Sequence, residues 1–241
     1  MCDRRIENEV AHGRRITEMW SGTLWYWETP AGRLRWARRV KMLTGHLASG
    51  MNVLEIGCGM GYFTREIVAS GPRVTAVDIS PDLLKIARER NASEHVTFRL
   101  ADANKMDFPD DSFDAIVGSA ILHHLDIHKA LKEFYRVLKP EGTIFFTEPN
   151  MLNPQIFLQK NVPLLKKWAG DSPDETAFFR WPLKRILAAN RFTHIEITPF
   201  DFLHPATPRG LIFAIDRLGL GMERIPALKE IAGSLFIRAR K

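Results

Sequence analysis

Three glycines at alternate positions follow a short apolar segment and constrain this fold more than any other feature of the chain. Residues 53–56 predict a buried strand, and glycines follow at positions 57, 59 and 61. Glycine suits a backbone that takes unusual dihedral angles or lets a ligand approach closely. A strand, a glycine-rich turn and a helix predict a nucleotide-binding corner at the carboxyl end of a parallel sheet. The G-x-G-x-G spacing differs from the G-x-G-x-x-G that seats a dinucleotide pyrophosphate.

Two more acids stand at the ends of later apolar segments. Residues 74–78 predict a β-branched strand that ends in Asp78, and residues 96–100 predict a strand that is followed by Asp102. The first carboxylate can accept hydrogen bonds from both hydroxyls of a ribose, and the second is placed to accept from an adenine amino group. With Glu55 beside the glycine turn, these acids predict a site for an adenosine whose tail is an amino acid rather than a phosphate chain.

These motifs resemble those of the class I S-adenosylmethionine-dependent methyltransferases, and most closely the branch that acts on small molecules. The resemblance covers roughly residues 50 to 150, through the segments LEIGCGMG, VDIS, ADA, SFDAIVGSAILHHL and RVLKPEGTIFF. It implies S-adenosylmethionine as the cofactor. It also implies an α/β, Rossmann-like fold with a mostly parallel seven-stranded sheet, helices on both faces, an antiparallel last strand and insertions after strands 5 and 6.

The resemblance assigns cofactor contacts to particular residues of this chain. The glycine loop would hold the methionine part, Asp78 the ribose and Asp102 the adenine, while the N-terminal aromatics resemble a lid over the cofactor. A hydrophobic plug in the domain core is the alternative role for those aromatics, Trp20, Trp25, Tyr26 and Trp27. The expected cofactor-binding residues are Tyr26, Glu55, Gly57, Cys58, Gly59, Gly61, Asp78, Ile79, Asp102, Ala103 and Ser119. Glu141 departs from a frequent Gly-Gly turn, which is harmless if position 141 needs no positive φ.

Bulk properties narrow the class of protein further. The 241 residues suit one larger α/β domain, and 45% hydrophobic residues can bury a full core. The charged N-terminus lacks the apolar run of a signal peptide, and two cysteines do not suggest a disulfide framework, so we expect a cytoplasmic protein. The net charge of +6 is moderate. We expect no nucleic-acid partner, whereas peripheral contact with a membrane and the oligomeric state stay open.

The order of the predicted elements indicates one domain with three parts. Alternating strands and helices between residues 49 and 148 predict a parallel sheet that forms the cofactor-binding core. Residues 1–48 would supply the N-terminal lid and a helix near 33–48, and residues 149–241 would cover the acceptor and add the final strands. Within that last part we expect helices near 155–168, 182–190 and 209–218 and strands near 192–198 and 234–240.

Methyl transfer from a sulfonium requires alignment of the acceptor and, for a hydroxyl or ammonium acceptor, a base. The loop after the fourth strand carries His123 and His124, and an imidazole suits proton transfer near neutral pH. His124 is the preferred base, because related enzymes place a histidine just before the following leucine. Glu148 at the end of the fifth strand would bind or deprotonate the acceptor. The alternatives are that both histidines only shape the loop and that Glu148 tethers it.

The remaining polar and aromatic residues predict the character of the acceptor site. Aromatic residues after Glu148 suggest an apolar acceptor pocket, with Glu148, Asn150, Asn153, Gln155 and His204 as its polar groups. The equal alternative is that these aromatics only pack an insertion against the sheet. The arginine-rich helix 33–41 is predicted to present a solvated outer face. The other histidines show no metal-ligand spacing with cysteine or acid partners, so we expect no metal.

We therefore predict an S-adenosylmethionine-dependent methyltransferase that methylates a small-molecule or lipid-linked acceptor by direct displacement. Two rival classes remain at this stage. An NAD-dependent oxidoreductase is disfavoured by the glycine spacing and the two further acids. A non-catalytic S-adenosylmethionine-binding regulator is compatible with the same sequence.

Overall fold

A seven-stranded sheet organises the chain, whose computed structural model describes residues 4–18, 26–168 and 175–241. The strand order is β3-β2-β1-β4-β5-β7-β6. Strands β1 to β5 run parallel to one another, while β7 is antiparallel to both β5 and β6. The strands are β1 (Asn52–Ile56), β2 (Arg73–Asp78), β3 (Val96–Leu100), β4 (Phe113–Ser119), β5 (Leu138–Pro149), β6 (Thr193–Phe200) and β7 (Ser234–Arg240). The predicted α/β fold is confirmed.

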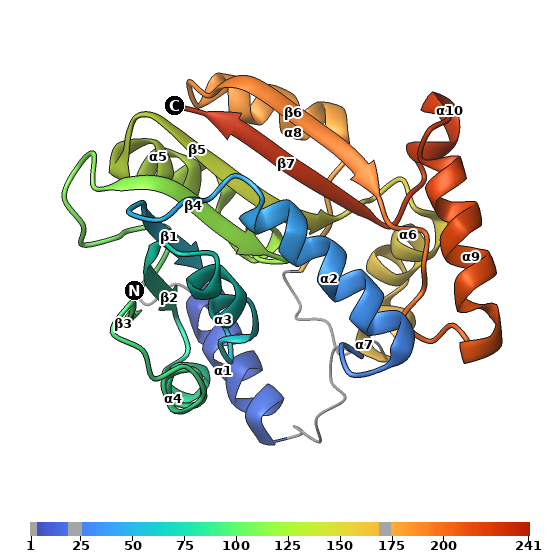
Figure 1. Cartoon of the computed structure of the whole chain (residues 1–241), viewed down its shortest axis with the longest axis horizontal. Helices are drawn as coiled ribbons and strands as arrows, with labels where there is room; N and C mark the ends of the chain where they lie inside the picture. The colour runs from blue at the N-terminus through green and yellow to red at the C-terminus, as the bar shows by residue number, and fades with distance from the viewer. Residues whose placement is uncertain (1–3, 19–25, 169–174) are drawn as a thin grey trace.

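Helices pack on both faces of the sheet and enclose two apolar cores (Figure 1). One core joins the sheet to α5 and α8, through residues such as Phe134 and Leu187, and the other joins it to α2, α3 and α4, through Leu43, Ile67 and Leu84. The helices are α1 (Arg4–Glu18), α2 (Pro30–Thr44), α3 (Tyr62–Ala69), α4 (Pro81–Arg90), η1 (Leu122–His124), α5 (Ile127–Val137), α6 (Pro154–Asn161), α7 (Pro163–Trp168), α8 (Arg180–Ala189), α9 (Arg209–Met222) and α10 (Pro226–Lys229).

Local sequence signals explain where the helices begin. Ser80 caps α4, because its hydroxyl accepts from the amide of Leu83, and Pro81 occupies the first turn. Thr29 caps α2 in the same way through the amide of Gly32. The predicted helix over 155–168 is divided into α6 and α7, since Pro163 cannot donate an amide hydrogen bond and begins a new helix.

The insertions fall where the sequence predicted them. Residues 150–192 carry α6, α7 and α8 between β5 and β6, and residues 201–233 carry α9 and α10 between β6 and β7. One local expectation needs correction. Glu141 lies in the irregular first part of β5 and has a φ of +71°, so this position does require the left-handed region that glycine adopts without strain.

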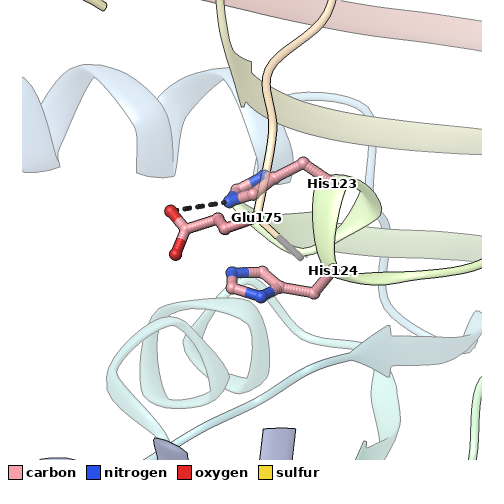
Figure 2. A group of neighbouring side chains, drawn as sticks. All are labelled: His123, His124 and Glu175. Atoms are coloured by element: carbon pink, nitrogen blue, oxygen red, sulfur yellow. Dashed lines mark ion pairs between the residues drawn. The ribbon is translucent and has the colours of Figure 1, made fainter. Parts of the chain in front are cut away.

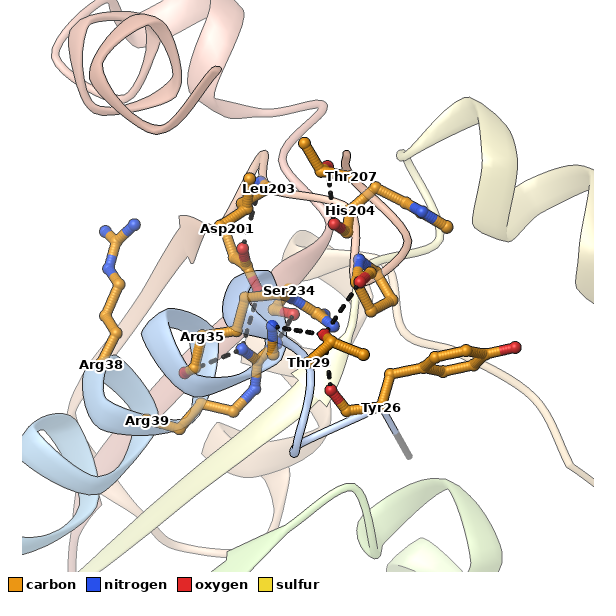
Figure 3. Close-up of polar contacts among 12 residues, drawn as sticks. Tyr26, Thr29, Arg35, Arg38, Arg39, Asp201, Leu203, His204, Thr207 and Ser234 are labelled. Atoms are coloured by element: carbon orange, nitrogen blue, oxygen red, sulfur yellow. Dashed lines mark hydrogen bonds and ion pairs between the residues drawn. The ribbon is translucent and has the colours of Figure 1, made fainter. Parts of the chain in front are cut away.

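Three arginines of α2, Arg35, Arg38 and Arg39, also differ from expectation, since they bind protein groups rather than face solvent (Figure 3). Arg39 is 5% exposed, and it binds the Asp201 carboxylate at 2.7 Å and the Ser234 hydroxyl at 2.6 Å. Arg35 binds the same carboxylate at 2.9 Å, and Arg38 pairs with Glu223 of α9. A helical pattern of charges cannot distinguish water from an insertion distant in sequence, and that insertion supplies both acids.

Candidate active site

A cavity of about 240 Å³ opens at the carboxyl edge of the parallel strands. Its walls come from the turns after β1, β2, β3 and β4, and from α1, which lies across them. Nine of the expected site residues line it: Gly57, Cys58, Gly59, Asp78, Ile79, Asp102, Ala103, Ser119 and His124. The parallel topology brings them together, because strands of one direction present their carboxyl ends at one edge.

The three glycines of the first turn have different structural roles, although all have positive φ. A Cβ at Gly57 would lie 2.4 Å from the Ile121 side chain, and one at Gly61 would lie 2.2 Å from the Asn91 side chain. Those two positions therefore require glycine for packing. A Cβ at Gly59 would have no atom within 4 Å. Gly59 lines the cavity, so its backbone is the part of the loop that a ligand can approach closely.

Asp78 ties the glycine loop to the end of β2. Its Oδ2 accepts from the amide of Gly59 at 2.8 Å, and its Oδ1 accepts from the amide of Ser80 at 2.9 Å. Burial raises the pKa of Asp78, while hydrogen bonds from backbone amides and the nearby His124 oppose that rise. The carboxylate thus shapes the loop and also borders the cavity.

Other expected cofactor residues lie at different depths. Asp102 borders the cavity, and its Oδ1 accepts from the amide of Asn104 at 2.9 Å, which fixes the turn after β3. Glu55 and Gly61 do not line the cavity. Glu55 is buried beneath the loop, and burial raises its pKa to about 8 despite a neighbouring Thr64 hydroxyl.

Of the N-terminal aromatic residues that the structure describes, Trp27 lines the cavity and Tyr26 does not. Tyr26 is 50% exposed and occupies a tight turn with a φ of 57°. Trp27 packs edge-to-face against Phe63 of α3, with a ring separation of 6.2 Å, and Phe63 also borders the cavity. Trp20 and Trp25 lie outside the described residues.

Glu148 and His123 form a buried pair beside the cavity and do not line it. The Oε1 of Glu148 accepts from the amides of Ile121 and Leu122 at 2.9 and 2.8 Å, and its Oε2 lies 2.6 Å from Nδ1 of His123. The carboxylate is therefore fully engaged in holding the loop after β4. This geometry favours the alternative that Glu148 tethers the loop.

Glu175 completes an ion-pair network around His123 (Figure 2). Its Oε1 lies 3.5 Å from Nε2 of His123 and also pairs with Lys160 of α6. Burial alone would lower the pKa of His123, but the two carboxylates outweigh it and raise that pKa to about 9. His123 is thus a buried imidazolium at neutral pH, which is a poor proton acceptor.

His123, His124 and Glu175 also bring three potential metal-ligand atoms within 4.8 Å of one another. No local pattern indicates this group, because Glu175 lies 51 residues beyond His124. Within it, Glu148 and Lys160 already partner His123 and Glu175. The expected absence of a metal stays a prediction.

His124 lies beside His123, with ring centroids 4.3 Å apart, and also meets the N-terminal helix. An oxygen of Glu9 lies 2.9 Å from Nδ1 of His124, and His12 stacks on the imidazole with ring centroids 6.3 Å apart. Helix α1 approaches closely because Gly13 faces Ser80, where a Cβ would come within 2.6 Å of the serine hydroxyl. The sequence analysis predicted no helix before residue 33, whereas α1 lines the cavity with the polar Arg5, Glu9 and His12 and the apolar Ile6 and Ile16.

The polar side chains expected around the acceptor instead contact other groups of the protein. Asn150 donates to the carbonyls of Glu230 and Ala232 at 2.8 and 2.7 Å, and Asn153 caps α6. Nε2 of Gln155 lies 2.9 Å from Nε2 of His204. None of these expected groups lines the cavity.

Comparison with known proteins identifies the family. The family described as "Methyltransferase domain" matches residues 54–146. A demethylmenaquinone methyltransferase of Staphylococcus aureus is 30% identical over 186 residues, which are 68% of this chain and 77% of that protein. A malonyl-[acyl-carrier protein] O-methyltransferase of Serratia marcescens is 39% identical over 99 residues, which are 41% of this chain. The match spans 38% of the length of the Serratia protein and 60% of the length of a demethylmenaquinone methyltransferase of Tropheryma whipplei. The chain thus spans about half the length of these relatives.

Solved structures share the whole fold. A methyltransferase of Thermotoga maritima described as a possible histamine N-methyltransferase has a TM-score of 0.71, with 18% identity over 96% of this chain and 99% of that chain. The N-methyltransferase NodS of Bradyrhizobium japonicum, in complex with S-adenosyl-L-homocysteine, has a TM-score of 0.66, with 19% identity over 97% and 98%. With the sequence relatives above, the fold and the cavity show that this chain belongs to the class I S-adenosylmethionine-dependent methyltransferases.

The residues present fit the cofactor of this family. Asp78 and Asp102 offer acceptors on the second and third strands, and the backbone of Gly59 is open to the cavity. The carboxylate Oε2 of Glu55 is buried without a recorded partner among the described residues, close to where the methionine part is expected. Among those residues, no helix combines the length and apolarity needed to cross a membrane.

Proposed function

We propose that this chain methylates a small-molecule or lipid-linked acceptor by direct in-line displacement, without a metal. One observation carries the proposal: a single cavity is bordered by the glycine loop, by Asp78 and Asp102, and by His124. S-adenosylmethionine supplies a methyl group on a sulfonium. The acceptor atom bonds to the methyl carbon as the sulfur–carbon bond breaks, and the sulfur keeps the electron pair.

The residues of the chain divide this work between binding and proton transfer. Asp78, Asp102 and the backbone at Gly59 hold and orient the cofactor, which supplies the alignment that such a displacement requires. His124 accepts the proton of an acceptor hydroxyl or ammonium, and the Glu9 carboxylate, 2.9 Å from its Nδ1, stabilises the imidazolium that forms. His123 and Glu148 position the loop that carries His124.

The parts of the chain have matching tasks in this proposal. Residues 49–148 bind the cofactor, residues 1–48 close over it, and residues 149–241 cover the acceptor. Glu175 supports the last assignment, since it reaches the histidine loop from that segment. The quinone precursor in the name of the Staphylococcus relative favours a lipid-linked acceptor, which a cytoplasmic enzyme would take at a membrane surface.

Turnover with labelled S-adenosylmethionine tests the proposal. The acceptors are a short-chain 1,4-naphthoquinol, a malonyl thioester and a primary amine, which represent the chemistry named in the sequence and structural relatives. We expect label transfer to one of them, and its loss in His124→Ala with the affinity for S-adenosylhomocysteine retained. Tight cofactor binding without transfer to any acceptor class would instead favour a regulatory protein.

A further inference from the structure

Helix α9 exposes four large apolar side chains. Phe213 is 77% exposed, Leu218 65% and Leu211 53%, and Leu220 is exposed as well. A Cβ added at Gly210 or Gly221 would have no atom within 4 Å, so the side of the helix that carries these glycines meets open space. At about 100° per residue, Leu211 and Leu218 lie along one flank of that side and Phe213 and Leu220 along the other. We call these four residues the α9 apolar face. Large side chains gathered at such exposure mark an interaction surface more often than a bare surface.

The opposite side of α9 attaches the helix to the protein by a narrow stripe. Ile212 is buried in a small cluster with Ala31 and Leu203, and a Cβ at Gly219 would lie 3.0 Å from Phe202. Internal packing therefore accounts for one side of the helix only. The bright red-orange helix stands at the edge of the molecule, away from the sheet (Figure 1).

Charges on α9 are divided between the same two sides. Glu223 pairs with Arg38 of α2, and Asp216 lies close enough to raise the pKa of that arginine. Arg209, Arg217 and Arg224 are exposed, and among the described residues no ion pair is recorded for them. Both acids thus lie toward the protein, and Arg217 lies between the two apolar flanks, with its guanidinium 6.0 Å from the centre of the Phe213 ring.

We propose that the α9 apolar face docks on an anionic lipid surface. Apolar side chains flanked by arginines, without an outward acid, match the interface of a membrane with negatively charged headgroups. A second copy of the chain would bring the same three arginines against each other near a two-fold axis, which the charge pattern disfavours. Dimerisation through this face is the alternative, and the experiment below distinguishes it from lipid binding.

Docking there would bring the membrane next to the closing part of the active site. The loop that leads into α9 contacts the turn before α2, because the Thr29 hydroxyl donates to the carbonyl of Pro205 at 3.1 Å (Figure 3). Trp27 of the same turn lines the cavity. The delivery of a lipid-linked acceptor by this route rests on the proposed function, whereas lipid binding itself does not.

Sedimentation with vesicles tests the proposal without cofactor or acceptor. The full chain is mixed with vesicles of phosphatidylcholine alone, or of equal parts phosphatidylcholine and phosphatidylglycerol. We expect binding to the anionic vesicles that is weakened by salt. Phe213→Ser with Leu218→Ser should lower the partition coefficient at least about tenfold. Arg217→Glu should lower it by about fivefold or more on anionic vesicles only.

Leu100→Ser is the matched control, because Leu100 is an exposed leucine on the β3 edge and should leave vesicle binding unchanged. Retained binding of S-adenosylhomocysteine shows that each variant is folded. Equal binding by the wild type and the Phe213/Leu218 variant would overturn the proposal. So would a concentration-dependent dimer, lost in that variant, with no vesicle binding. Methyl transfer to a water-soluble acceptor is measured separately, so either proposal can fail alone.

Discussion

Replacing Glu148 by glutamine should lower the free energy of unfolding at low pH and leave it nearly unchanged above pH 9. The variant keeps an oxygen for the amides of Ile121 and Leu122 and removes the negative charge that lies 2.6 Å from Nδ1 of His123. His123 and Glu148 are buried, with 4% and 1% exposure, so water cannot replace the lost partner. The perturbation is therefore confined to one buried charge pair.

The pKa of His123 fixes the sign and the size of the effect. Burial opposes the charge, but Glu148 and then Glu175 raise the pKa from 6.5 to about 9. A raised pKa in the folded state gives stability that is fully present below pH 6.5 and is lost as the pH rises through 9. The net shift corresponds to about 3 kcal/mol, and Glu148 is the largest of the causes that raise the pKa. The variant should thus be less stable by an amount of that order at low pH and approach the wild type above pH 9.

Urea unfolding at several pH values between about 6 and 9.5 measures the difference directly. Glu94→Gln is the control, because Glu94 and His95 form an exposed pair at 3.8 Å and should show no pH-dependent difference. Proton NMR of the His123 ring should show its pKa falling in the Glu148→Gln protein. Parallel stability curves for the wild type and this variant would refute a charged His123.

Three further predictions concern the cofactor, the base and the strained turn. Asp78→Asn should weaken S-adenosylhomocysteine binding about 100-fold, since two charge-assisted hydrogen bonds are lost; an unchanged calorimetric Kd would limit Asp78 to shaping the loop. His124→Ala should lower kcat with nearly unchanged cofactor affinity, and Glu9→Gln should reduce kcat less and alter its pH profile; silence in both would indicate catalysis by alignment alone. Glu141→Gly should raise Tm by about 2–4 °C, from relief of about 1 kcal/mol at φ +71°, because the exposed pair of Glu141 with Arg240 contributes little; a lower Tm would contradict that balance.

The fold was predictable because its signals are local and repeated. Each strand of the core is a short apolar run that ends in a turn residue, and caps such as Ser80 mark where helices begin. Parallel topology then fixes which residues meet, so Asp78 and Asp102 could be placed at one edge before the structure. Turn strain was less accessible, since φ at Glu141 depends on how β4 and β5 align around it.

Roles within the site were harder to predict where a partner comes from far along the chain. The two adjacent histidines differ because Glu148 and Glu175 enclose one and Glu9 meets the other. Nothing in a local pattern distinguishes them. The arginines of α2 are a second case, because the acid that buries Arg39, Asp201, is 162 residues away.

The division of labour between the two histidines follows from what holds each in place. His123 is held by the sheet through Glu148 and by α1 through Arg5, which donates to the His123 carbonyl at 3.2 Å. His124 instead has its recorded carboxylate partner on α1, which seats only because Gly13 permits close approach to Ser80. In the proposed function, α1 both covers the cavity and brings Glu9 within 2.9 Å of Nδ1 of His124. The proposed base then has this carboxylate partner only while the cofactor is enclosed, which protects a reactive sulfonium from water.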